Sequence, residues 1–74
     1  FVRDYIAQVL AGEPSGLDVP TLTKRVLAAG WHTELATDAK RNATVRSVLY
    51  TIPDVVEKIG YGVWRLKVQN MSDV

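Results

Sequence analysis

The segment Asp38–Pro53 contains an apolar stripe that any compact fold of this chain has to bury. Four residues follow the spacing i, i+3, i+4 and i+7 of one helix face, namely Val45, Val48, Leu49 and Ile52. The carboxylate of Asp38 is expected to cap the first turn, and Pro53 disfavours helical backbone at the residue before it. The segment therefore predicts an amphipathic helix around residues 39–52.

The opposite side of this predicted helix is basic and rich in hydrogen-bonding groups. At about 100° per residue, that side carries Lys40, Ala43, Arg46, Ser47 and Tyr50 and no acid. A short basic face of this kind suits insertion into a DNA major groove. It also suits docking on an acidic protein, and every surface helix needs some solvated face.

The charge distribution along the chain adds weight to this helix. The net charge is only +1 over 74 residues. Residues 1–39 hold three cations and five acids, whereas residues 40–67 hold six cations and two acids. Positive charge is therefore gathered in the half that contains the predicted helix, which is the distribution expected of a nucleic-acid contact surface.

Two more helices are predicted before this segment. The first has a helical stripe made of Val2, Tyr5, Ile6, Val9 and Leu10. Gly12 is expected to end it in a left-handed conformation. The second runs from Pro20 to Ala29, where proline suits the first helical turn, and its core stripe is Val19, Leu22, Val26 and Ala29. Residues 17–19 between the two helices are expected to form a brief extended segment.

A β-hairpin is predicted after the third helix. The runs Val55–Ile59 and Val63–Val68 are β-branched and aromatic, and Gly60-Tyr61-Gly62 separates them. In the second run, the apolar residues Trp64 and Leu66 alternate with Arg65 and Lys67, so one face of the strand is expected to be apolar and the other basic. Three helices followed by a hairpin predict an α+β winged helix over residues 1–69, in which the short extended segment joins the hairpin as a third strand. Residues 70–74 are expected to fray.

Several short motifs resemble the HARE-type helix-turn-helix domain. The matching residues are Gly12, Glu13, Pro14, Gly30, Trp31, Ala43, Thr44, Val45, Leu49, Tyr50, Gly60, Gly62, Trp64 and Leu66. The likeness spans residues 2–66. The chain departs from the family in two places: Lys40-Arg41 stand where the third helix often begins with Thr-Pro, and the spacer before the hairpin is shortened to Pro53-Asp54.

The resemblance implies a winged-helix module carried by chromatin factors, by restriction or modification enzymes, or by transcription machinery. In such proteins the module is expected to contact double-stranded DNA and regulate transcription, or to bind a protein partner. The chain begins at Phe1, so we expect a piece of a larger intracellular protein of the nucleus or of a bacterial cytoplasm.

The candidate DNA-binding residues lie on the third helix and on the hairpin. They are Lys40, Arg41, Ala43, Thr44, Arg46, Ser47, Tyr50, Lys58, Arg65 and Lys67. Arg46 is the best placed for bidentate contact with guanine. Arg41 is expected to reach sideways, to a phosphate or to an acid such as Glu34. Cations on the hairpin equally serve to protect an edge strand from aggregation.

Other classes of function find little support in the residues. The chain has no cysteine and a lone histidine, His32, so neither a metal site nor a cofactor site is expected. No nucleophile or phosphate-loop motif is present, and we expect no enzyme activity. No apolar run has the roughly 18–20 residues of a membrane helix. We expect no small-molecule ligand and no membrane.

Overall fold

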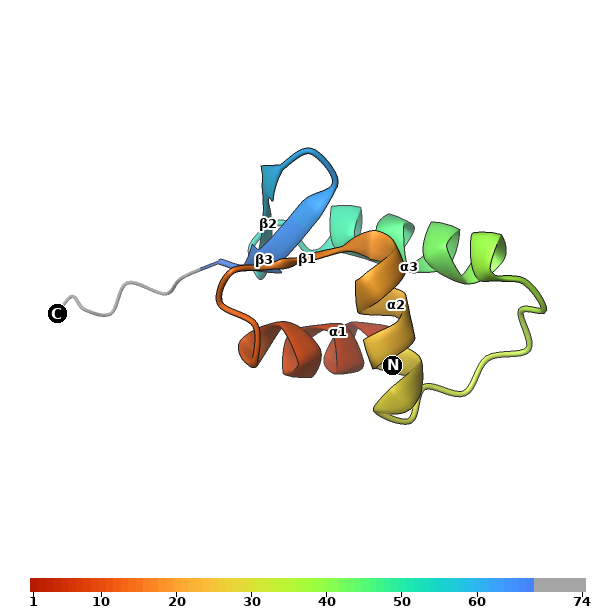
Figure 1. The fold of residues 1–74 in the computed structure, drawn as a ribbon. Helices are drawn as coiled ribbons and strands as arrows, with labels where there is room; N and C mark the ends of the chain where they lie inside the picture. The colour runs from red at the N-terminus through yellow and green to blue at the C-terminus, as the bar shows by residue number, and fades with distance from the viewer. Residues whose placement is uncertain (68–74) are drawn as a thin grey trace, which may run out of the picture.

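The computed structural model describes residues 1–67, which form three helices and three strands. Figure 1 shows how these elements are arranged. In order, the elements are α1 (Val2–Ala11), β1 (Leu17–Asp18), α2 (Val19–Ala28), α3 (Asp38–Thr51), β2 (Val56–Gly60) and β3 (Val63–Leu66). This confirms the predicted α+β layout of a winged helix, with a small hairpin as the wing. The predicted tail 70–74 and the predicted strand end at Val68 lie outside the described residues.

The three strands form one antiparallel sheet in the order β1-β3-β2. The expected third strand is confirmed, since Leu17 of β1 pairs with Trp64 of β3. The hairpin turns between Gly60 and Val63, where Gly62 has a φ of +73°. Only glycine takes that backbone conformation readily, so the residue order at the tip sets where the hairpin reverses.

The core lies between the helices and the inner face of the sheet. Its buried members are Ile6, Leu10, Val19, Leu22, Val26, Val45, Leu49, Ile52, Val56 and Trp64. The predicted stripes supply nearly all of them. Ala29 was predicted to be core and is exposed, because α2 ends at Ala28. Thr23 is buried instead, and its hydroxyl donates a 2.9 Å hydrogen bond to the carbonyl oxygen of Val19.

The helix ends differ from the predicted ones in three places. The cap of α3 is Thr37, whose Oγ1 accepts from the Lys40 amide at 3.2 Å, so the predicted cap at Asp38 is wrong by one residue. The cap of α2 is Asp18, which starts that helix before Pro20. Gly12 has a φ of −90°, so the predicted left-handed end of α1 is also wrong. There the last turn is closed by a 3.1 Å hydrogen bond from the Gly12 amide to the carbonyl oxygen of Val9.

Leu49 has no exposed surface, and replacing it tests the packing of α3. Leu49→Ala is expected to lower the free energy of unfolding by about 2–5 kcal/mol, because the lost contacts leave a cavity. Chemical denaturation of both proteins measures this difference. The exposed neighbour Ala43 is the control, since Ala43→Ser removes no core contact. A Leu49→Ala protein as stable as the parent would contradict this packing.

The cap of α2 makes part of the stability depend on pH. The Asp18 carboxylate accepts hydrogen bonds from Thr21, of which the bond from the Thr21 side chain has the largest effect and the bond from its backbone amide a smaller one. These bonds lower the pKa of Asp18 below its ordinary value of 3.8. The Asp18 carboxylate therefore stabilises the fold above pH 3.8, and this contribution is lost as pH falls through the lowered pKa. Asp18→Ala is expected to cost about 1 kcal/mol at pH 7 and less in strong acid, where the cap is neutral.

Asp18→Asn is the control for this experiment. Asparagine caps a helix about as well as aspartate but does not titrate. Thermal melts from pH 7 to pH 2 are expected to show less acid loss for Asp18→Asn than for the parent. Parallel pH profiles for these two proteins would contradict the role of the carboxylate.

Candidate nucleic-acid interface

The exposed face of α3 is the centre of the candidate interface. Lys40, Ala43, Arg46, Ser47 and Tyr50 are all exposed, while Thr44 is half-buried at the edge of this face. The buried residues Val45 and Leu49 lie on the other side of the helix. The structure therefore brings together on one helix the side chains that the sequence predicted to be on one face.

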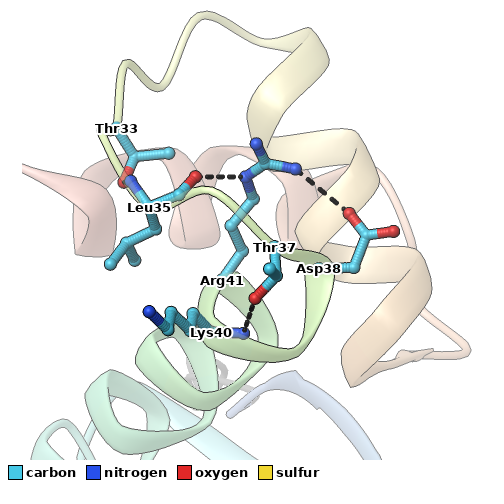
Figure 2. Close-up of polar contacts among 6 residues, drawn as sticks. All are labelled: Thr33, Leu35, Thr37, Asp38, Lys40 and Arg41. Carbon is cyan, nitrogen blue, oxygen red and sulfur yellow. Dashed lines mark hydrogen bonds and ion pairs between the residues drawn. The ribbon is translucent and has the colours of Figure 1, made fainter.

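Arg41 belongs to a different arrangement, which holds the loop before α3. Figure 2 shows its guanidinium between two acceptors, with Nε donating to the carbonyl oxygen of Leu35 and Nη1 donating to Asp38 Oδ1, both at 3.1 Å. The Leu35 amide in turn donates to Thr33 Oγ1 at 3.1 Å. The predicted acid partner Glu34 is wrong, and Asp38 takes its place. The Arg41 side chain therefore connects the loop of residues 33–35 to the first turn of α3.

The cations of the wing divide between its two faces. Arg65 lies directly across from Glu57, and its Nε is 2.7 Å from Glu57 Oε2. Lys58 lies across from Trp64, which puts it on the other face of the hairpin. The predicted group of three hairpin cations is therefore split: Arg65 is neutralised by an acid of its own sheet, while Lys58 is exposed on the side of the core tryptophan. Lys67 is exposed just beyond β3.

An aromatic contact connects α3 to the wing. The rings of Tyr50 and Trp64 meet edge to face, with centroids 5.1 Å apart and an interplanar angle of 88°. Such a contact contributes about 0.5–1.5 kcal/mol beyond burial. Tyr50 keeps 60% of its surface exposed, whereas Trp64 keeps 6%. Tyr50 was predicted as a DNA contact only, and the structure gives it a positioning role for the wing.

The remaining cations of this surface define its electrostatics. Among residues 1–67, Lys40, Arg46 and Lys58 form no ion pair with an acid, in contrast to Arg41 and Arg65. A cation without an intramolecular partner interacts with an approaching phosphate at full charge. The free positive charge of the interface is therefore concentrated on α3 and on the inner face of the wing.

The structure adds side chains that the sequence analysis did not propose as contacts. Tyr61 is fully exposed at the tip of the wing, and its place between two glycines was the signal that marked it. On the far flank of α3, a hollow of about 220 Å³ lies against α2, and Lys24 and Asn42 contribute polar groups to its lining. Lys24 belongs to α2 and Asn42 to α3, so only the packing of the two helices brings these side chains to one hollow.

The described part of the chain offers no metal centre, since no three of its His, Asp or Glu side chains gather where an ion could be held. None of its helices combines the length and apolar content that crossing a membrane requires. Comparison with protein-family models, with curated proteins and with solved structures finds no match to this chain.

The double hydrogen bond of Arg41 generates a prediction about the loop. Arg41→Gln is expected to lower the free energy of unfolding by about 1 kcal/mol, because hydrogen bonds from a partly buried charged donor are lost. Amide exchange of residues 33–37 is expected to accelerate. Arg46→Gln is the control, since an exposed side chain without a partner changes stability by at most about 0.5 kcal/mol. Equal effects of the two substitutions would contradict the role of Arg41.

Proposed function

We propose that this chain is a DNA-binding winged-helix module that reads duplex DNA. Helix α3 enters the major groove, and the hairpin of β2 and β3 contacts the backbone. The observation that carries the proposal is the exposed face of α3, which holds no acid and on which Lys40 and Arg46 form no ion pair with any residue of 1–67. A major groove about 12 Å wide admits one α-helix with such a face.

The side chains of this face divide into base contacts and backbone contacts. Arg46 offers a planar fork of donors that fits the O6 and N7 acceptors of guanine. Ser47 offers a hydroxyl for base edges, and the methyl group of Ala43 suits the methyl group of thymine. Lys40 near the start of the helix suits a phosphate, as does the hydroxyl of Thr44 at the edge of the face.

Intramolecular ion pairs narrow the set of phosphate contacts. Lys40, Lys58 and Lys67 are the cations best placed for this role. Arg65 is left out of this set, because its Nε lies 2.7 Å from Glu57 Oε2 and its charge is balanced within the sheet. Arg41 serves the interface indirectly, by fixing the loop that precedes the reading helix.

The resemblance to the HARE-type domain supplies a context for this function. The chain has the winged-helix layout which that resemblance implies. On this basis the module acts inside the cell, in a chromatin factor, in a restriction or modification enzyme, or in transcription regulation. Its role would be to hold the parent protein on duplex DNA.

A second candidate function is recruitment of a protein partner. The observation that favours it is an open hollow of about 360 Å³ between the start of α1 and α3, which is lined by Phe1, Val2, Arg3, Val48 and Thr51. This hollow lies beside the neutral flank of α3, where its lining includes Thr51. Most of this lining is apolar and fits a hydrophobic side chain of a partner, while Arg3 suits an acidic side chain next to it.

Fluorescence anisotropy with labelled duplexes at several salt concentrations tests the DNA proposal. About three to four neutralised phosphates are expected to give a log–log salt slope of about −2.7 to −3.6. Lys58→Gln is expected to flatten the slope by about 0.9 and to weaken binding to all sequences alike. Arg46→Ala is expected to cost about 1–3 kcal/mol on a preferred site and to relax discrimination there.

The pair Glu57 and Arg65 offers a matched control. The double variant Glu57→Gln with Arg65→Gln removes one charge of each sign, and it is expected to leave the salt slope unchanged. Undetectable binding at low salt would overturn the proposal. So would unchanged binding when Lys40, Arg46 and Lys58 are neutralised together. Either result would favour the protein partner.

A further inference from the structure

The tip of the wing carries one aromatic ring that no other part of the described chain covers. Tyr61 has a relative exposure of 102%, higher than that of any other large apolar side chain in residues 1–67. A side chain added at either flanking residue, Gly60 or Gly62, would meet no atom within 4 Å. At an exposure of 102%, both faces of the tyrosine ring are open to solvent. Aromatic residues usually gain stability by burial, so this position contributes little to the fold.

The charges near the tip are arranged on one face of the hairpin. Lys58 lies on the face of Trp64, which in turn contacts Tyr50 of α3. Lys58, which forms no ion pair within residues 1–67, therefore lies on the face of the hairpin that is turned toward α3. Glu57, the acid of β2, lies on the opposite face and is held by Arg65 at 2.7 Å.

The apolar side chains next to the tip, Ile59 and Val63, lie over the outer face of the sheet. An added Cβ at Gly16 would be 3.0 Å from Ile59 Cδ1 and 3.0 Å from Val63 Cγ1, so these two side chains gather over the outer face of the sheet. A single ring with both faces free suits a flat ligand the size of one base, whereas protein interfaces usually place such a ring within a packed cluster.

We infer that the wing tip is a stacking site for an unpaired base. This inference rests on the proposed function, in which α3 holds the neighbouring duplex. Within an intact duplex the faces of the bases are covered by their neighbours, and Tyr61 finds nothing to stack on. Beside a bulge, a gap or a single-stranded end, a base is free to lie on the ring while Lys58 pairs with its phosphate. The preferred ligand is duplex DNA that adjoins unpaired nucleotides.

The experiment compares two DNA molecules with the same duplex. One is fully paired, and the other carries one unpaired 2-aminopurine, whose fluorescence falls when it stacks. The parent protein is expected to bind the second about 5- to 150-fold more tightly and to quench the probe. Tyr61→Ala is expected to lose both the preference and the quenching, while Tyr61→Phe keeps both because the ring remains. All three proteins are expected to bind the paired duplex equally and to melt alike, since Tyr61 is exposed.

The outcomes separate this inference from the proposed function. Equal binding of both DNAs by the parent, or a preference retained by Tyr61→Ala, would overturn the stacking site and leave the duplex proposal intact. Binding of the unpaired probe without binding of the duplex would support stacking at the tip but overturn the role of α3. Absence of binding to either DNA would overturn both and would favour a protein ligand for Tyr61.

Discussion

The burial of Trp64 joins the wing to the helices, and the geometry of the candidate interface depends on it. This residue is on the middle strand of the sheet, between partners on β1 and β2, and its side chain belongs to the core. Its ring also meets the edge of Tyr50 on α3. A domain of this size has few core residues that could hold the sheet against the helices. One side chain therefore sets how the hairpin stands relative to the helix that is proposed to read DNA.

The close approach of β1 to this strand has a specific backbone requirement. Gly16 has a φ of +89°, and an added Cβ would lie 2.9 Å from the carbonyl oxygen of Trp64. Neither the conformation nor the distance tolerates a larger residue without movement. The turn after α1 therefore needs a glycine at this position to pass so close to the central strand of the sheet.

Intramolecular partners divide the six cations of residues 40–67 into two groups. Arg41 and Arg65 are held by Asp38 and Glu57. Lys40, Arg46 and Lys58 form no ion pair within residues 1–67, and Lys67 is exposed beyond β3. The paired cations shape the surface, since one holds a loop and the other links two strands. The free ones are available to a ligand. A count of charges along the chain does not make this distinction, although it decides how strongly such a surface attracts phosphate.

Local pattern alone determined the three helices, the hairpin and most of the core. Leu49 and Trp64 were recognisable because burial of one face imposes a period of 3.6 residues on a helix and of 2 on a strand. The exposed face of α3 followed from the same rule. Helix ends were less predictable: Thr37 and Asp38 are both good caps, and only the backbone shows which of them stands outside the helix.

Tertiary structure decided which side chains meet. The pairing of Glu57 with Arg65 depends on the hairpin register, which the turn at Tyr61-Gly62 and the irregularity between Lys58 and Gly60 establish together. Arg41 found the carbonyl oxygen of Leu35 because the preceding loop folds back over α3. In both contacts, the two partners lie in different segments of the chain, so neither the helical period of 3.6 nor the strand period of 2 relates their positions. Sequence periodicity therefore does not predict them, because they depend on how the loop and the strands are arranged in space.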